Sequence, residues 1–171
     1  GLMKRGFSFL KEDQVGKKVF SEKITLVDDP NYPETYPYKQ DLTGISRSRY
    51  PIFDAGVFKG FLWTQDDADE FNATPTGHTV PHYSLILKPG EKQIDSLEAL
   101  EGMKQKNDLL YVPFLHYMNI VNPSKGIITG SSRFGTLLLK SDGSVMTPYN
   151  VRLTQSLLDI FGEKVAWLSE K

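Results

Sequence analysis

Proline and glycine interrupt this chain so often that only short regular elements fit between them. The sequence has 10 prolines and 14 glycines among 171 residues. Proline lacks the N–H that a sheet ladder needs, and it breaks the interior of a helix. Pro30, Pro33 and Pro37 crowd one stretch, so we expect residues 30–44 to form a long irregular loop. Elsewhere the spacing predicts short strands and short helices.

The segments between these residues have the pattern of antiparallel strands. Asp54-Ala55-Gly56 separates two extended segments, 46–53 and 57–63, as the turn of a hairpin does. Ser141-Asp142-Gly143 plays the same part between segments 136–140 and 144–147. Further extended segments are predicted over 17–20, 23–27, 82–87, 108–112 and 165–168.

Helix signals are few and local. Thr64 precedes an acidic segment, 65–71, and is predicted to cap a short helix there. A second helix is expected over 96–102, and a third between its predicted cap, Thr154, and Gly162. Together these patterns predict an α+β fold of mainly antiparallel sheet with hairpins and two or three short helices, in a single domain over 1–171.

The charge balance and the lack of cysteine exclude several functions. The 20 Lys and Arg nearly cancel the 21 Asp and Glu, and no cysteine is present. We therefore expect no nucleic-acid partner and no membrane partner. A disulfide framework, a thiolate zinc site and a cysteine nucleophile are excluded. The longest apolar runs fall short of the roughly 18 residues of a membrane helix, and we expect a cytoplasmic protein.

Two groups of residues have metal-ligand chemistry, each with a simpler explanation. His78 and His82 are four residues apart and could share a metal with His116. Pro81 argues against the helix that this spacing requires, so hydrogen-bonded histidines are the alternative. The acidic run 66–70 could bind calcium, but it lacks the spacing of a calcium loop, and a helix start explains it as well.

Carboxylates, tyrosines and cations offer further candidates. Asp28 and Asp29 could act as paired acid–base groups, or could form the turn before Pro30. Loop 30–44 carries tyrosines that could recognise a partner or could pack over the sheet; these are Tyr32, Tyr36 and Tyr38. The scattered cations Lys17, Lys18, Arg47 and Arg49 are expected on a solvated surface.

Ordered motifs along nearly the whole chain resemble the C-terminal region of one family, the TldD/PmbA proteins. These are predicted metallopeptidases that are also called modulators of DNA gyrase. Segment 16–30 resembles the family's G-x-x-V-F-S-x-x-I-T-V-V-D-D-P, and segment 54–62 its E-N-G-V-L-K-G-Y-L. Weaker matches in the same order are 74–78, 87–90, 121–126, 134–143 and 155–160.

The resemblance implies a larger, paired assembly. Family members act as paired subunits that enclose a cavity for extended polypeptide. The catalytic subunit holds its metal with a His-Glu-x-x-x-His helix, upstream of the region seen here, and with a cysteine. We therefore expect no catalytic residue, no metal ligand and no cofactor in this chain, with zinc only in a catalytic full-length relative or partner. A homodimer or heterodimer with a TldD/PmbA-type subunit is expected.

The resemblance also suggests which residues contact a polypeptide substrate. We expect Asp28, Asp29, Thr76, Gly77 and His78 to line the cavity, and the polypeptide to bind partly by strand addition to an open sheet edge. The chain is then either a piece of a longer protein or a degenerate, non-catalytic member. The alternative function is a non-enzymatic interaction module that uses loop 30–44 and its three tyrosines.

Overall fold

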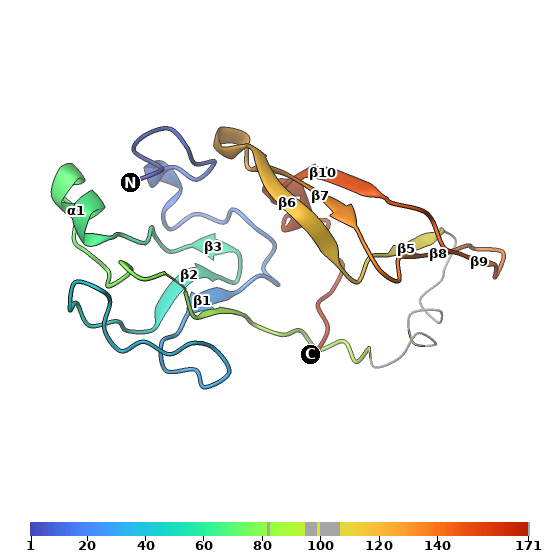
Figure 1. Ribbon diagram of the computed structural model, residues 1–171, viewed down its shortest axis with the longest axis horizontal. Helices are drawn as coiled ribbons and strands as arrows, with labels where there is room; N and C mark the ends of the chain where they lie inside the picture. The colour runs from blue at the N-terminus through green and yellow to red at the C-terminus, as the bar shows by residue number, and fades with distance from the viewer. Residues whose placement is uncertain (82, 95–98, 100–106, 171) are drawn as a thin grey trace.

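Three antiparallel sheets form the body of the protein in the computed structural model, which describes residues 1–81, 83–94, 99 and 107–170 (Figure 1). The expected α+β fold of mainly antiparallel sheet is confirmed. Figure 1 shows the first sheet toward one end of the molecule and the other two toward the opposite end. Within the part of the chain that the structure describes, no helix is long and apolar enough to cross a membrane.

The first sheet has the strand order β3-β2-β1-β4, so β3 and β4 are its edges. Its strands are β1 (Leu26–Asp28), β2 (Tyr50–Asp54), β3 (Val57–Phe58) and β4 (Leu85–Leu87). The predicted hairpin joins β2 to β3 through Ala55 and Gly56, whose φ angles of 46° and 78° are both positive. Two positive φ angles give a type I′ turn, whose twist matches that of the strands.

The predicted cap of the first helix is also confirmed. Helix α1 (Gln65–Phe71) begins after Thr64, whose side chain accepts a hydrogen bond from the backbone N–H of Asp67. The helix ends at Asn72, which has a left-handed backbone. The short 3₁₀ helix η1 (Glu12–Gln14) precedes the first sheet.

The second and third sheets are built from the later part of the chain. The second has the order β10-β7-β6, with β6 (Leu115–Asn122), β7 (Ile127–Ser132) and β10 (Arg152–Ser156). The third has the order β5-β8-β9, with β5 (Leu109–Tyr111), β8 (Leu137–Leu139) and β9 (Val145–Met146). The predicted second hairpin is the β8–β9 pair. The 3₁₀ turn η2 (Pro123–Lys125), capped by the Asn122 side chain, links β6 to β7.

Two predictions near the C-terminus are wrong. Thr154 caps no helix, because it lies in β10 and its hydroxyl is 2.9 Å from that of Thr129 on β7. Ser156 caps the short helix α3 (Leu157–Ile160) instead. Segment 165–168 forms no strand. Its Val165 and Leu168 side chains pack instead against the hydrophobic core around Phe20 and Phe53. The pairing there is a single parallel bridge between Ser169 and Lys92, made by backbone hydrogen bonds of Lys92 with Leu168 and Glu170.

Other predicted segments are shorter than expected or lie outside the described residues. The segment 17–20 contributes one antiparallel bridge, from Lys18 to Val57, and no named strand. Strand β4 covers only the end of segment 82–87. The helix expected over 96–102 lies, apart from Ala99, outside the described residues.

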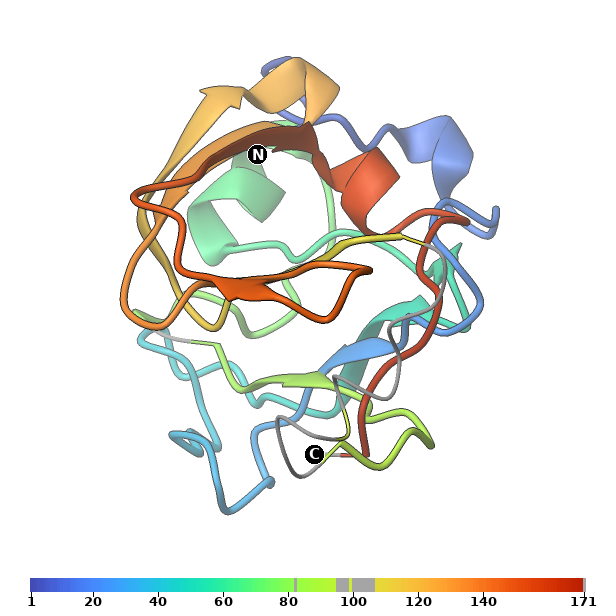
Figure 2. The ribbon, with the colours of Figure 1, turned by 90° about the vertical axis from the view of Figure 1, so that its right-hand side faces the viewer.

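An aromatic core holds the first sheet and the C-terminal segment together. Phe20, Ile24, Phe53 and Phe58 are buried, and the rings of Phe20 and Phe53 are 4.4 Å apart between centroids. Phe161, Val165 and Leu168 also pack on this cluster. The chain therefore returns from the second sheet to the first after β10, as Figures 1 and 2 show.

Candidate functional site

A buried carboxylate at the end of β1 organises the candidate site. The Asp28 side chain is fully buried, and Arg47 Nη2 donates to its two oxygens at 2.9 and 2.7 Å. The backbone N–H of Ser84 donates at 2.6 Å, and His78 Nε2 lies 3.0 Å from Oδ2. Burial alone would raise the pKa of Asp28, but the hydrogen bonds from His78, Arg47 and Ser84 outweigh it and hold the pKa below its usual value. We call Asp28, Arg47, Thr76, His78 and Ser84 the Asp28 cluster.

The geometry of His78 follows from that carboxylate. An ionised carboxylate can only accept, so the proton of the Asp28–His78 hydrogen bond lies on Nε2. The other ring nitrogen, Nδ1, is 2.8 Å from the Thr76 hydroxyl, which also bonds the backbone of Trp63. The rings of Tyr50 and Tyr83 approach the imidazole edge-on. An Asp–His–Thr series has the atom types of a nucleophilic triad, but here Asp28 and His78 are sealed from solvent, so the arrangement stabilises the fold.

Gly77 is required by the close approach of two chain segments. Its φ is +72°, and a Cβ there would lie 3.0 Å from the Ser46 carbonyl oxygen and 3.1 Å from Arg47 Cγ. A larger residue would therefore be strained and would push Arg47 away from Asp28. The segment 76–78 thus packs directly on the Arg47 side chain.

The structure brings four of the five residues expected to line a cavity into one place. His78 is hydrogen-bonded to Asp28 through Nε2 and to Thr76 through Nδ1, and Gly77 lies between Thr76 and His78. Asp29 is separate: its carboxylate caps the N–H of Asn31 and lies 3.7 Å from Arg49 Nε.

Sequence reasoning missed two members of the cluster. Arg47 was expected on a solvated surface, and this was wrong because its guanidinium is the buried counterion of Asp28. Ser84 contributes its backbone N–H and a hydroxyl, which donates to the Tyr36 carbonyl. No local pattern marks either residue, since their partners lie 19 and 56 positions away.

The expected irregular loop 30–44 is confirmed, and its backbone is anchored to the same cluster. Arg47 N–H donates to the Lys39 carbonyl and Arg47 Nη1 to that of Tyr38. Asp41 accepts from the N–H groups of Ile45 and Thr79. The aromatic side chains stay accessible, with Tyr36 75% exposed. Tyr32 and Tyr38 are also exposed, so the loop presents tyrosines on a fixed backbone.

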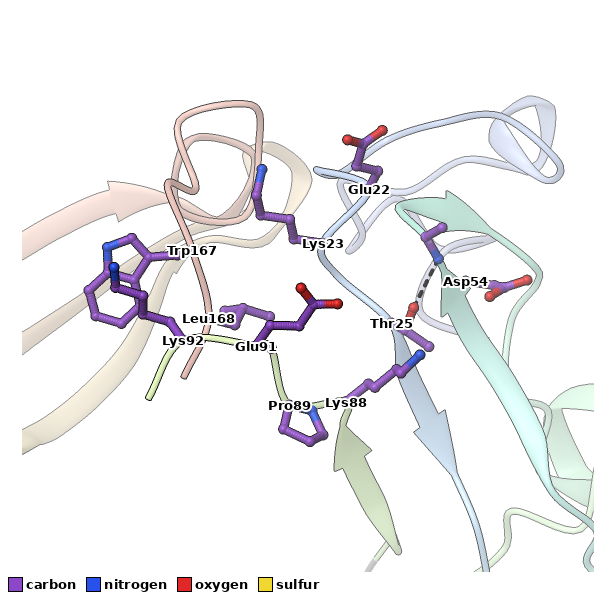
Figure 3. A pocket seen from close by; sticks show the side chains of 12 residues that line it. Glu22, Lys23, Thr25, Asp54, Lys88, Pro89, Glu91, Lys92, Trp167 and Leu168 are labelled. Carbon is purple, nitrogen blue, oxygen red and sulfur yellow. Dashed lines mark hydrogen bonds between the residues drawn. The ribbon is translucent and has the colours of Figure 1, made fainter. Parts of the chain in front are cut away.

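A groove of about 870 Å³ lies at the other end of the first sheet (Figure 3). The hairpin turn after β2, the segment after β4 and the C-terminal segment form its walls. Its charges balance, because the lining holds three lysines and three acids: Lys23, Lys88 and Lys92, with Glu22, Asp54 and Glu91. Trp167 and Leu168 supply an apolar side. No member of the Asp28 cluster lines this groove.

The described residues do not form the metal site that the histidine spacing suggests. Among the described residues, no group of three or more His, Cys, Asp or Glu is placed to hold a metal. His82 lies outside the described residues. His78 bonds Asp28, and His116 is in β6 of the second sheet. The acidic run at 66–70 begins helix α1, where Asp67 pairs with Arg5.

Strand β6 exposes apolar side chains on both of its faces. Tyr117, Met118, Ile120 and Val121 are all exposed, and Ile120 reaches 70%. The strand is an edge of its sheet, and it contains no charged residue and no proline. Charged residues and prolines usually keep an edge strand from pairing with another chain, and β6 lacks both. The strand is irregular at two places, because its register with β7 shifts between His116 and Asn119, where Tyr117 has a positive φ, and again between Ile120 and Asn122.

Comparison with known sequences places these features in a family. The model of the PmbA/TldA metallopeptidase C-terminal domain matches residues 1–171. A metalloprotease of Archaeoglobus fulgidus is 26% identical over 163 residues, which cover 91% of this chain and 37% of the relative. A metalloprotease of Methanothermobacter thermautotrophicus is 28% identical over 105 residues, or 56% of this chain and 23% of the relative. The chain thus spans well under half the length of these relatives.

Solved structures share the fold. A candidate modulator of DNA gyrase from Bacteroides thetaiotaomicron superposes with a TM-score of 0.73 at 22% identity, covering 94% of this chain and 35% of that one. TldE from Thermococcus kodakarensis gives a TM-score of 0.71 at 22% identity, covering 93% of this chain and 39% of that one.

We predict that Asp28→Asn destabilises the protein by about 3–5 kcal/mol, because it leaves the Arg47 guanidinium buried without a counterion. The matched control is Asp29→Asn, which keeps the cap on Asn31 and loses only a long contact with Arg49. That control should cost less than about 1 kcal/mol. Urea unfolding at neutral pH measures both, and equal losses would contradict the assignment.

The stability contributed by Asp28 should also depend on pH. Its pKa is lower in the folded state than its ordinary value of 3.8, so the contribution is complete above that value. It is lost as the pH falls from 3.8 through the folded-state pKa. The difference in unfolding free energy between wild type and Asp28→Asn should therefore be constant near neutral pH and shrink in this acidic range. A constant difference throughout would refute the proposed linkage.

Proposed function

We propose that this chain, which belongs to the PmbA/TldA metallopeptidase family and corresponds to its C-terminal domain, supplies a subunit interface and part of a polypeptide-binding wall. In this proposal the chain holds no metal ligand and no catalytic residue. Zinc would be held by a catalytic full-length relative or partner. The partner would be a TldD/PmbA-type subunit, in a homodimer or a heterodimer.

The observation that carries the interface is strand β6. Burying one apolar side chain of this size is worth roughly 1.5–3 kcal/mol, so the four exposed side chains on β6 favour a covered state. Because they lie on both faces, a single strand or sheet pairing with the free edge of β6 would cover part of each face. Backbone hydrogen bonds along that edge would add affinity without demanding a particular sequence.

The polypeptide-binding wall is proposed at β4 and the groove that continues it. β4 is an edge strand of the first sheet. Its Leu85 and Leu87 side chains are exposed, and Leu85 pairs with Asp28 on β1. The residues that follow it, 88–92, line the groove. A groove with balanced charges and one apolar side suits extended polypeptide of mixed composition.

The residues expected to line the cavity keep a place in this proposal. Asp29 and Thr76 are half-buried, while Asp28, Gly77 and His78 lie beneath the surface. The buried three would hold β4 and loop 30–44 in position, Thr76 would fix the His78 ring, and Asp29, whose N–H donates to the Ser84 carbonyl just before β4, would face the polypeptide.

Replacing Ile120 by Lys should disrupt the interface, because it places a charge in the apolar edge that the partner covers. Light scattering coupled to size-exclusion chromatography should show the wild type associating and the variant as a monomer. Leu42→Lys is the control, since Leu42 is an apolar side chain of similar exposure, 78%, in loop 30–44. A wild type that stays monomeric both alone and when mixed with a TldD/PmbA-type subunit, or equal effects of the two variants, would refute the β6 interface.

The same association assay distinguishes the proposed β6 interface from the alternative function, a non-enzymatic interaction module. An interaction module built on loop 30–44 is favoured by its exposed tyrosines on an anchored backbone. It would lose partner binding when Tyr32, Tyr36 and Tyr38 are replaced by Ala, and it would tolerate Ile120→Lys. The proposal made here requires the opposite pattern.

The purified chain should bind no zinc at stoichiometric level and should not cleave unfolded casein. Elemental analysis after dialysis against zinc, together with a fluorescent casein assay, tests both statements. Stoichiometric zinc accompanied by proteolysis would overturn the non-catalytic assignment.

A further inference from the structure

A small hollow lies where the end of β7 meets the segment before β10. Its volume is about 150 Å³, and two short stretches line it: 132–136 and 147–150. The stretches are tied together by paired hydrogen bonds, because Ser132 N–H donates to the Val151 carbonyl and Val151 N–H donates to the Ser132 hydroxyl. The walls of the hollow are therefore fixed by the sheet.

The charge of this hollow is positive. Arg133 is the only charged residue among those that line it, and the lining holds no Asp or Glu. The guanidinium lies 5.4 Å from the centre of the Tyr117 ring, and it makes no ion pair with any residue in the described ranges. Arginine stays charged at every physiological pH and presents a planar fork of donors that matches a carboxylate.

A second, independent feature points to an absent ligand. Thr136 also lines the hollow, is only 4% exposed, and its hydroxyl finds no hydrogen-bond partner among the described residues. Buried hydroxyls are nearly always hydrogen-bonded, so an exception needs an explanation. Thr147 and Asn150 add further polar groups to the same wall. A ligand with oxygen acceptors in the hollow would neutralise Arg133, and one that reached the Thr136 hydroxyl would also supply its missing partner.

The mouth of the hollow is aromatic. Phe134 is 79% exposed and Tyr149 is 91% exposed. Phe134 also has a φ of +52°, a conformation that is rare for a bulky residue and that concentrates at functional sites. Apolar rings beside a cationic pocket suit a ligand that carries an apolar group next to its anionic one.

We propose that this hollow binds the C-terminal carboxylate of a polypeptide, with Arg133 and the Thr136 hydroxyl donating to its oxygens. Phe134 and Tyr149 would contact the side chain of the last residue. A carboxylate fits better than a phosphate, because one guanidinium balances a single negative charge and the hollow is small. This inference rests on the proposed polypeptide-binding function and adds to it a second point of contact.

The test is fluorescence anisotropy of the 171-residue chain with a labelled peptide that ends in Phe. The peptide is prepared with a free C-terminal carboxylate and as the C-terminal amide. We expect amidation to weaken binding by about tenfold or more, because the carboxylate provides the charge-assisted hydrogen bonds. Arg133→Gln, which removes the charge, and Thr136→Val, which preserves shape, should weaken binding of the free acid and leave binding of the amide unchanged. Arg152→Gln, an exposed cation on β10 outside the hollow, is the control.

The outcomes distinguish this site from the wider proposal. Equal binding of acid and amide would overturn the carboxylate site and leave the polypeptide-binding function standing. Absence of binding by both peptides would overturn the inference and the polypeptide-binding wall together. A third peptide, amidated and carrying an internal Asp beside Phe, separates the two sources of a carboxylate. If it binds as well as the free acid, the assignment to a chain terminus is wrong.

Discussion

One buried carboxylate determines how the first half of this protein is assembled. Asp28 accepts hydrogen bonds from residues 19, 50 and 56 positions away in the sequence. An ionised carboxylate without solvent is costly unless every oxygen is satisfied, so the segments that carry these donors must converge on the end of β1. Arg47 then fixes the backbone of loop 30–44, and Ser84 places β4 at the sheet edge. The loop and the edge strand owe their positions to this cluster.

The remainder of the chain has little core of its own. Among the described residues, the buried hydrophobic side chains are Phe20, Ile24, Val27, Phe53, Phe58, Ala68 and Leu139, and of these only Leu139 belongs to the second and third sheets. Exposed apolar side chains on β6, by contrast, cover both faces of an edge strand. This uneven burial is the physical basis of the interface proposed at β6.

Local chemistry could be predicted from the sequence, and long-range pairing could not. The Ala55-Gly56 turn and the Thr64 cap are decided by a few adjacent residues, and both are confirmed. Thr154 is equally suited to a cap and to a strand, and its pairing with Thr129 on β7 decided the outcome. β6 lacks the polar–apolar alternation of a half-buried strand, so its pattern gave no signal. The family resemblance singled out Asp28 and His78, but their counterion, Arg47, is buried only because the fold brings it to Asp28.

The proposed dependence of β6 on a partner can be tested directly by native-state hydrogen exchange on the chain at a concentration where it is monomeric. Amides paired between β1 and β2 should exchange only through global unfolding, because the core and the Asp28 cluster lie there. Amides paired between β6 and β7 should exchange at least about a hundredfold faster, through local opening. Equal protection of the two sheets in the monomer would contradict the account, because β6 would then need no partner to be stable.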